Sequence, residues 1–315
     1  MNKPKLWIMV GLSGSGKSTI AAKLADENPN TIIVSSDAIR EELTGDRSNQ
    51  ERNEEVFRLF HERIRKNLEN KYNVIADATN ITMKSRRAIL EKINGLNIEK
   101  ICYLFPKPFD LCKTDNLNRE YPVPEYVLDK QILKFQIPFN QEGFDRIVIL
   151  RNKDWDFGYR IGSSDIFSRM NGFNQKNPHH SMTLADHCNN AYRLFCTEYL
   201  HRIPEVNPEY HNGFAMGAKL HDIGKLATQT VDKDGIAHYY RHENQGCYYI
   251  LSQMRLPNFW AHDELLDCCF LINYHMMPFS WTNDKAKRKW QRRFGEYKYK
   301  MLMDFNECDR ARYNE

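Results

Sequence analysis

This chain of 315 residues lacks several features that mark whole classes of protein. No apolar run approaches the roughly 20 residues needed to cross a bilayer, so we expect no membrane partner. The amino terminus runs straight into an apolar stretch and lacks the layout of a signal peptide. The eight cysteines form no CxxC pair and follow no regular spacing. Without an export signal, they are expected to be reduced thiols in a cytoplasmic protein.

A large excess of one charge is also missing, since the net charge is only +4 at pH 7. A mildly basic balance permits a nucleic-acid partner without requiring one. The hydrophobic fraction of 41% is that of an ordinary globular protein. The length predicts two domains with separate cores, and the oligomeric state stays open.

Histidine is nearly absent from the first half of the chain. Only His61 precedes His179, and the other ten histidines lie between residues 179 and 275. Because imidazole is a common metal ligand, this asymmetry predicts a metal-binding second half.

Alternating apolar and helical stretches predict an α/β first domain over residues 1–150, with a parallel sheet and helices on both faces. The expected strands are 6–10, 31–35, 73–76, 98–105 and 147–150, and the expected helices are 17–26, 51–70 and 126–135. Residues 151–172 are interpreted as a connector. The domain expected over 173–315 is all-α, with helices near 184–200, 212–228, 240–254, 262–276, 284–295 and 299–312.

The first strand is followed by a phosphate-binding loop, Gly11-Leu12-Ser13-Gly14-Ser15-Gly16-Lys17-Ser18, which opens a helix. Backbone N–H groups and the positive end of the helix favour phosphate there. Lys17 is expected to reach the β- and γ-phosphates, and Ser18 to ligate Mg²⁺. The residues expected to hold ATP or another nucleoside triphosphate are Gly14, Ser15, Gly16, Lys17, Ser18 and Thr19.

Three further positions bear on the reaction. Asp37 follows a strand beside the loop, where a carboxylate can take the proton of an attacking hydroxyl or simply cap a helix; Arg40 shares its helical face and could hold an acceptor phosphate. Asp77 ends another strand and could either hold a magnesium-bound water or cap the next helix. Arg119 is either a lid arginine that closes over the triphosphate or a solvated surface residue.

The series GLSGSGKST, SSDAIR, DATN and NRE..VPE resembles the kinase domain of 5′-hydroxyl polynucleotide kinases over residues 5–145. The resemblance implies that Lys17 and Ser18 bind ATP and magnesium and that Asp37 is the general base. It also implies that Arg40 contacts the acceptor's phosphate and that Arg119 stabilises the γ-phosphate. Some relatives have Asp directly before Thr-Asn, so Asp77-Ala78-Thr79-Asn80 departs from the pattern. Small-molecule kinases share much of this layout.

In the second half, one dipeptide, His221-Asp222, has metal-ligand candidates around it. Imidazole and carboxylate ligands contributed by several helices suit Mn, Ni, Co, Fe or Zn, which activate water for hydrolysis. The other candidates are His187, His242, His275 and a carboxylate near the end, Asp309 or its rival Asp304. Each histidine alone could instead be a hydrogen-bonded core residue.

The order H…HD…H…H…D resembles the HD phosphohydrolase superfamily over residues 173–315. The resemblance implies that one metal is held by His187, His221, Asp222 and Asp309. His242 and His275 would complete a second metal site, and Lys225 would face the substrate phosphate. His179, His180, His238 and His262 are not assigned to metal, although His180 could line the substrate pocket.

A basic and aromatic stretch near the carboxyl end has two interpretations. Phosphodiesters bind basic side chains, and unpaired bases stack on aromatic rings, so the stretch could be an RNA track. Alternatively, Trp290 and Phe294 are buried and the basic residues form a solvated face. The residues are Lys285, Lys287, Arg288, Lys289, Arg292, Arg293, Trp290, Phe294, Tyr297 and Tyr299.

Together these patterns predict a bifunctional RNA end-healing enzyme. It would phosphorylate 5′-hydroxyl RNA or DNA ends with ATP and remove 2′,3′-cyclic, 2′- or 3′-phosphates. No ligase motif is evident, so a separate RNA ligase is an expected partner. The alternatives are a metabolite kinase fused to a nucleotide phosphohydrolase, and an HD nuclease regulated by ATP.

Overall fold

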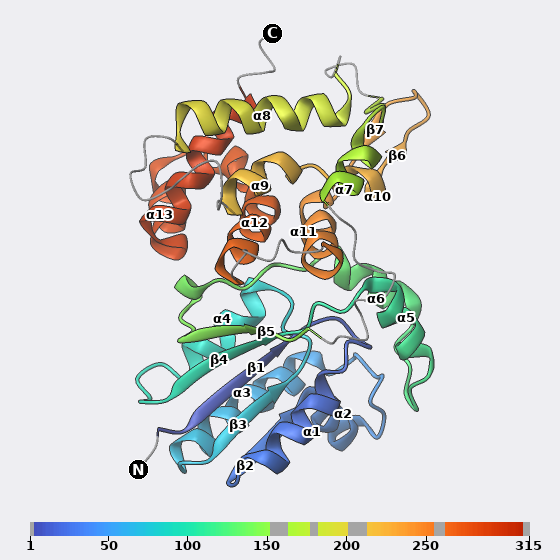
Figure 1. Cartoon of the computed structure of the whole chain (residues 1–315). Coiled ribbons are helices and arrows are strands. Elements are labelled where there is room, and N and C mark those ends of the chain that lie inside the picture. Colours follow the sequence, from blue (N-terminus) through green and yellow to red (C-terminus); the bar gives the residue numbers. More distant parts are fainter. Residues whose placement is uncertain (1–2, 152–162, 177–181, 201–212, 255–261, 311–315) are drawn as a thin grey trace. The chain divides into compact units, whose positions relative to one another are not determined.

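The computed structural model describes residues 3–151, 163–176, 182–200, 213–254 and 262–310. The chain divides into two compact units (Figure 1). Unit 1 comprises Met1–Ile132 and Pro138–Trp155, and unit 2 comprises Leu133–Ile137 and Asp156–Glu315. A five-residue segment near the end of the first half therefore packs with the second half.

Unit 1 is built on a parallel five-stranded sheet in the order β2-β3-β1-β4-β5. This confirms the predicted α/β sheet with flanking helices. The strands are β1 (Lys5–Val10), β2 (Thr31–Ser35), β3 (Asn73–Asp77), β4 (Glu99–Leu104) and β5 (Arg146–Ile149). Apolar side chains fill β1, where Leu6 to Val10 are all buried, because both faces of a parallel sheet are covered by helices.

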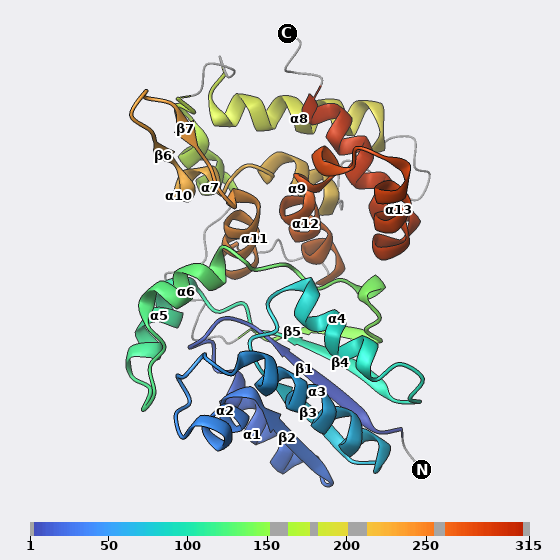
Figure 2. The ribbon, with the colours of Figure 1, turned by 180° about the vertical axis from the view of Figure 1, so that it is seen from behind.

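Helices cover both faces of this sheet. Helix α1 packs its Ala21 with Trp7 and Met9 of β1, whereas α3 and α4 lie over the other face, which Figure 2 shows. The helices of unit 1 are α1 (Lys17–Glu27), α2 (Ser36–Thr44), α3 (Asn53–Glu69), α4 (Met83–Lys92), α5 (Phe109–Leu117) and α6 (Glu125–Ile132), with a short 3₁₀ turn η1 (Asn140–Glu142). The carboxyl ends of β1, β2 and β3 meet at one edge, where the phosphate-binding loop and the residues after each strand gather.

Unit 2 is mainly helical, as predicted, but it also contains a small antiparallel hairpin. Strands β6 (Thr230–Val231) and β7 (Ala237–His238) pair across a turn at Gly235, whose φ of 78° is in the left-handed region. The helices are α7 (Ser163–Met170), α8 (Leu184–Glu198), α9 (Gly213–Leu220), α10 (Lys225–Thr228), α11 (His242–Gln253), α12 (His262–Tyr274) and α13 (Asp284–Arg310), with a 3₁₀ turn η4 (Met277–Ser280). In the described part of the chain, no helix is long and apolar enough to cross a membrane.

The structure differs from the predicted helices of unit 2 at two places. The helix expected over 212–228 is broken, because α9 ends at Leu220 and α10 begins at Lys225. Gly224 lies in the break, and a Cβ there would lie 2.0 Å from the carbonyl oxygen of His242, so only glycine fits. The helices expected at 284–295 and 299–312 form α13, which bends sharply at Gly295 (φ 74°, ψ 161°).

The segment Leu133–Ile137 is held in unit 2 by side chains of α11 and α12. The helix predicted over 126–135 ends earlier, at Ile132, ahead of Pro138. Asn244 Nδ2 donates to the carbonyl of Leu133 (2.7 Å). The backbone N–H of Ile137 donates to Asn273 Oδ1 (2.7 Å). Two further hydrogen bonds hold the segment. The Tyr274 hydroxyl donates to the carbonyl of Ile137 (2.9 Å), and Asn273 Nδ2 donates to the carbonyl of Phe135 (3.2 Å).

Candidate active sites

The phosphate-binding loop has the backbone that its glycines require. Gly14 and Gly16 have φ angles of 77° and 87°, which side chains with a Cβ rarely adopt. A Cβ on Gly14 would also lie 2.1 Å from the carbonyl oxygen of Cys112 in α5. Ser15 is buried, whereas Ser18 and Thr19 are exposed at the start of α1. The loop therefore presents backbone N–H groups and a helix amino terminus in the arrangement that binds phosphate.

Lys17 lies folded over this loop. Its Nζ donates to the carbonyl of Leu12 (2.7 Å) and lies 3.5 Å from Ser15 Oγ. Burial lowers the pKa of Lys17, and the nearby Asp77 carboxylate opposes that shift.

Asp77 contacts the phosphate-binding loop and does not cap the next helix. Ser18 Oγ donates to Asp77 Oδ2 (2.9 Å), while the cap of α4 is Thr82, whose side chain accepts from Ser85 N. Burial raises the pKa of Asp77, and Lys17 and the Ser18 hydrogen bond partly offset this. A hydroxyl and a carboxylate side by side are the oxygen ligands that Mg²⁺ prefers.

Asp37 lies between two guanidinium groups. Arg40 NH1 donates to Asp37 Oδ1 (2.8 Å), and Arg119 NH2 lies 3.8 Å from Asp37 Oδ2. The cap of α2 is Ser35, so Asp37 is not the helix cap. The Asp37 side chain is 48% exposed, which leaves its carboxylate accessible to an acceptor.

Arg40 is more enclosed than the sequence suggests. Its side chain is only 6% exposed, and NH2 also donates to Asn53 Oδ1 (3.1 Å) of α3. In this structure Arg40 orients Asp37, and its contact with an acceptor phosphate stays a prediction. Arg119, 36% exposed, is the more open of the two arginines.

Two residues that no sequence motif indicated support the loop. Gln131 of α6 pairs with Ser13 through both ends of its amide, accepting from the backbone N–H (2.8 Å) and donating to Oγ (3.0 Å). Buried Lys107 contacts Asp115 and donates to the carbonyl of Gly14 (3.2 Å). Both residues reach a loop distant from them in sequence, so no local pattern could have indicated them.

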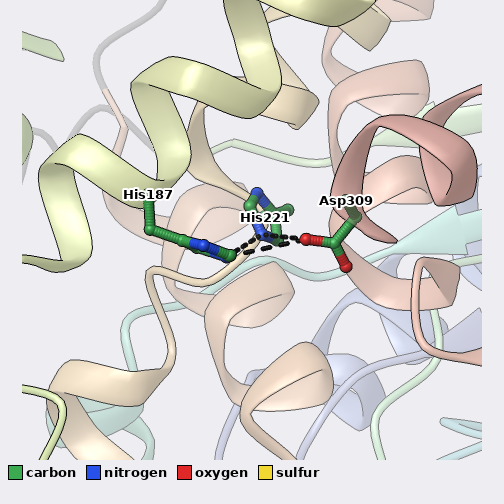
Figure 3. A group of neighbouring side chains, drawn as sticks. All are labelled: His187, His221 and Asp309. Atoms are coloured by element: carbon green, nitrogen blue, oxygen red, sulfur yellow. Dashed lines mark hydrogen bonds and ion pairs between the residues drawn. The ribbon is translucent and has the colours of Figure 1, made fainter. Parts of the chain in front are cut away.

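In unit 2, the predicted metal ligands come together from five places in the chain. They lie on α8, in the break between α9 and α10, at the start of α11, just after α12 and near the end of α13, and all are buried. The residues are His187, His221, Asp222, His242, His275 and Asp309. Three of them, His187, His221 and Asp309, point toward one another in Figure 3.

The carboxylate of Asp222 lies at the centre of the group. Its Oδ2 is 3.0 Å from His187 Nε2 and 3.3 Å from His221 Nε2. Its Oδ1 is 3.0 Å from His242 Nε2 and 3.6 Å from His275 Nε2. One oxygen therefore faces each histidine pair, as expected of a carboxylate that bridges two cation positions.

The spacing of the ligand atoms fits divalent metals. Two ligand atoms each about 2.1 Å from one ion lie about 3.0–3.4 Å apart at the usual bond angles. The Nε2 atoms of His187 and His221 are 3.2 Å apart, and those of His242 and His275 are 3.3 Å apart. Asp309 Oδ1 lies 3.6 Å from His187 and 3.5 Å from His221.

Three of the histidines are held so that Nε2 faces the centre. The Nδ1 atoms of His221, His242 and His275 lie 2.8, 2.9 and 2.8 Å from the backbone carbonyls of Ala218, Tyr239 and Ile272. An Nδ1–H that donates to a carbonyl leaves Nε2 with its lone pair, as a metal ligand needs. This hydrogen bonding favours a ligand role over that of ordinary core histidines.

Burial and the acidic groups set the protonation of the histidines in opposite directions. Burial lowers the pKa values of His187 and His275, and the Asp222 carboxylate offsets only part of this lowering. Burial has the largest single effect on His221 and disfavours its charge, but Asp222, Cys188 and Asp309 together outweigh it and raise the pKa of His221 well above its usual range.

Both carboxylates of the group favour the charged form despite their burial. Burial raises the pKa of Asp222, but Lys225 and His221 outweigh it and lower that pKa well below its usual range. Burial also opposes the charge on Asp309, yet the hydrogen bond and charge of His221 lower the pKa of Asp309. Ionised carboxylates suit divalent cations.

Asp309, and not Asp304, faces the cluster. Asp309 is 4% exposed and lies against His187 and His221. Asp304 pairs with Lys300 on the same helix. Five residues on a helix turn the side chain by about 140°, which explains why only one of these aspartates reaches the histidines.

Lys225 lies against the cluster. Its Nζ donates to Asp222 Oδ2 (2.7 Å) and to Gln175 Oε1 (2.9 Å). Its predicted contact with a substrate phosphate would therefore require it to share or leave Asp222. Cys188, which the sequence did not indicate, also has its Sγ near His221 and Asp222.

The histidines that were not assigned to metal have other positions where they are described. His238 pairs with Asp232 in the hairpin (2.9 Å), and His262 begins α12. His179 and His180, including the predicted pocket role of His180, lie outside the described residues.

Comparison with known proteins shows which kind of domain unit 1 resembles. Residues 6–138 match the family model described as an AAA domain. The L-seryl-tRNA(Sec) kinase of Methanococcus maripaludis is 28% identical over 144 residues, which cover 44% of this chain and 56% of that protein. Unit 1 is a kinase-like P-loop domain. Such a fold implies binding of ATP with Mg²⁺, although this chain matches only about half the length of its relative.

Solved structures give partial likenesses. A chain of the Pnkp1/Rnl/Hen1 RNA repair complex is 25% identical, with a TM-score of 0.39, over 42% of this chain and 44% of that chain. A fungal RNA kinase is 17% identical, with a TM-score of 0.35, over 49% and 78%. A gluconokinase from Sinorhizobium meliloti 1021 is 18% identical, with a TM-score of 0.34, over 48% and 83%. TM-scores this low support no inference about function.

Proposed function

We propose that the protein is a bifunctional RNA end-healing enzyme. Unit 1 phosphorylates 5′-hydroxyl ends of RNA or DNA with ATP. Unit 2 is a metal-dependent phosphoesterase of the HD type that removes 2′,3′-cyclic, 2′- or 3′-phosphates. The observation that carries the proposal is the convergence of four histidines and two aspartates on one point, in a chain whose other unit is a kinase-like P-loop domain.

In the kinase step, Asp37 is the general base that accepts the proton of the attacking hydroxyl. Arg40 fixes the orientation of the Asp37 carboxylate, and Arg119 neutralises charge on the transferred phosphoryl group. Lys17 moves from the loop carbonyl to the β- and γ-phosphates. Ser18 would hold Mg²⁺ directly, and Asp77, which accepts from Ser18 Oγ, would hold it through water.

In the phosphoesterase step, His187, His221, Asp222 and Asp309 would hold one divalent metal. Asp222, His242 and His275 would hold a second. Mn, Ni, Co, Fe or Zn bound there would supply Lewis acidity for water activation and for the phosphate oxygens. The carbonyl contacts of the histidines keep their Nε2 atoms aimed at that centre.

The two reactions belong to one substrate. Cleavage of RNA through its 2′-hydroxyl leaves a 2′,3′-cyclic phosphate on one fragment and a 5′-hydroxyl on the other. A protein with both activities restores both ends, and a separate RNA ligase seals them.

A second candidate, a small-molecule kinase fused to a nucleotide phosphohydrolase, is less well supported. The half-exposed carboxylate of Asp37 suits an acceptor that extends beyond the site. The matched relative is also named for an acceptor carried on a tRNA. Both observations favour a polynucleotide end over a free metabolite.

The test uses one RNA with a 5′-hydroxyl and a 2′,3′-cyclic phosphate. Labelled ATP should label its 5′ end, and added Mn²⁺, Ni²⁺ or Co²⁺ should promote loss of the cyclic phosphate. Asp37→Ala should abolish labelling and spare phosphate removal, and Asp222→Ala should do the reverse. Transfer to nucleosides but to no oligonucleotide would replace the proposal with the small-molecule kinase. Loss of both activities in either variant would argue against two independent sites.

A further inference from the structure

A stripe of positive charge runs along the first turns of α13. Lys285, Arg288, Lys289 and Arg292 are spaced i, i+3, i+4 and i+7, which places them on one face of the helix. All four side chains are exposed. We call these four residues the basic stripe.

Most aromatic residues of the same segment pack against one another, although Tyr297 is 45% exposed and Lys289 Nζ lies 5.6 Å from the centre of the Trp290 ring. Phe294 is fully buried. Trp290 stacks on it with ring centroids 5.2 Å apart. Trp281, itself 4% exposed, stacks on Trp290 (6.0 Å) and on Tyr299 (5.4 Å). The rings therefore pack on one another, as in the buried-aromatic interpretation, and hold the helix so that the stripe faces outward.

The basic stripe differs from the basic surface of α3 in whether its charges have acidic partners. On α3, Arg58 pairs with Glu62, and Arg65 pairs with Glu69. Throughout the described ranges, no carboxylate lies within ion-pair distance of any member of the stripe. Like charges at i, i+4 repel each other in the absence of a ligand. A polyanion along the stripe would relieve that repulsion.

We propose that the basic stripe binds the phosphodiester backbone of the RNA strand whose end unit 2 processes, an inference that rests on the proposed function. Lys285 and Arg292 are about 10 Å apart along the axis, which is roughly the span of three successive phosphates of an extended single strand. Because the four residues of the stripe offer positive charges and no ring, their contacts with RNA are to phosphates, which carry no sequence information. An anionic membrane is a poorer partner, since surface helices insert an apolar face and here that face is buried.

The test measures binding of a fluorescent 20-nucleotide RNA of mixed sequence, by anisotropy, over a range of salt concentrations. The stripe variant combines Lys285→Gln, Arg288→Gln, Lys289→Gln and Arg292→Gln. The control combines Arg58→Gln, Arg63→Gln, Arg65→Gln and Arg87→Gln, which removes the same charge from residues paired with Glu62, Glu42, Glu69 and Glu91. Thermal unfolding of both variants is measured to check that each one folds.

The stripe variant should bind RNA at least about tenfold more weakly at 100 mM salt. Its salt slope should fall by about 2, because each of about three phosphates that it no longer neutralises accounts for ~0.7 of the slope. The control should keep the wild-type slope.

Equal weakening in both variants, or wild-type binding by the stripe variant, would overturn the inference. Stripe-dependent binding to phosphatidylserine vesicles without stripe-dependent binding to RNA would overturn it as well. If the wild-type protein heals no RNA end but binds RNA through the stripe, the proposed function fails and the binding role of the stripe stands.

Discussion

Replacing Asp309 by Asn should disable the metal centre, whereas the same change at Asp304 should not. Both residues lie on α13, and both changes remove one carboxylate charge while keeping the shape of the side chain. Asp309 lies 3.5–3.6 Å from the Nε2 atoms of His221 and His187. Asp304 instead pairs with Lys300, whose side chain is 56% exposed.

The size of the effect follows from this geometry. Removing a residue that only orients a metal ligand weakens binding by about 10–100-fold, so removal of a direct ligand should weaken it by at least about 100-fold. That factor corresponds to ~2.8 kcal/mol, at about 1.4 kcal/mol per tenfold. Asp304→Asn should leave metal affinity unchanged; because the Asp304 side chain is only 14% exposed, its separate effect on stability is measured by thermal unfolding.

The assay combines calorimetric titration of the metal-free protein with Mn²⁺ and measurement of phosphate release from a 2′,3′-cyclic-phosphate RNA. Asp309→Asn should lose the tight binding event and most of the turnover, while Asp304→Asn behaves as wild type. If Asp309→Asn binds Mn²⁺ normally and Asp304→Asn does not, the assignment of the last ligand is wrong. If neither change affects binding, α13 contributes no ligand and the proposed centre is incorrect.

Three further substitutions test unit 1. In a labelled-ATP transfer assay, Asp37→Asn should lower the turnover of the kinase by about 10²–10⁴-fold, which is the usual contribution of a general base. Retained activity would assign the proton transfer to another group. Gly14→Ala should abolish ATP binding measured by calorimetry, because Gly14 has a φ of 77° and lies close to the backbone of α5. The control, Gly45→Ala, should leave ATP affinity unchanged, because Gly45 has a similar φ of 73° but open space around it. Arg86 NH2 of α4 lies 2.6 Å from Glu142 Oε1 of η1, and both side chains are buried. Arg86→Met should destabilise unit 1 by about 3–5 kcal/mol in denaturant unfolding, because it leaves the Glu142 carboxylate unpaired. Arg87→Met, whose partner Glu91 is 65% exposed, should cost less than about 1 kcal/mol; similar destabilisation in both would show that burial of the pair does not matter.

The strands and helices that the sequence predicted best are those with continuous local patterns. The apolar run of β1 and the long amphipathic stretch of α3 specify their own structure, because their periodicity matches a buried strand and a half-buried helix. The hairpin at Gly235 was not predicted, since two-residue strands carry almost no pattern. The break between α9 and α10 depends on how closely Gly224 approaches α11, which no local pattern shows.

The candidate sites divide in the same way. The motifs predicted which side chains gather, because each one follows a strand or lies on a helix whose ends are defined locally. They did not predict the burial of Arg40, which depends on Asn53 of another helix. They also did not predict that Lys225 pairs with Asp222 and Gln175. Such pairings depend on how separate elements pack, which the motifs do not encode.

The segment Leu133–Ile137 bears on how unit 2 can be separated from the rest of the chain. It lies in the first half of the sequence, yet its backbone supplies hydrogen-bond partners for Asn244 and Asn273, each two residues from a histidine of the candidate metal cluster. A fragment that begins at residue 151 would lose these partners and open the buried side chains of Asn244 and Asn273 to water. Such a fragment would lack part of the packing that holds α11 and the end of α12 beside the cluster. A cut that isolates unit 2 intact would therefore have to keep the five-residue segment with it.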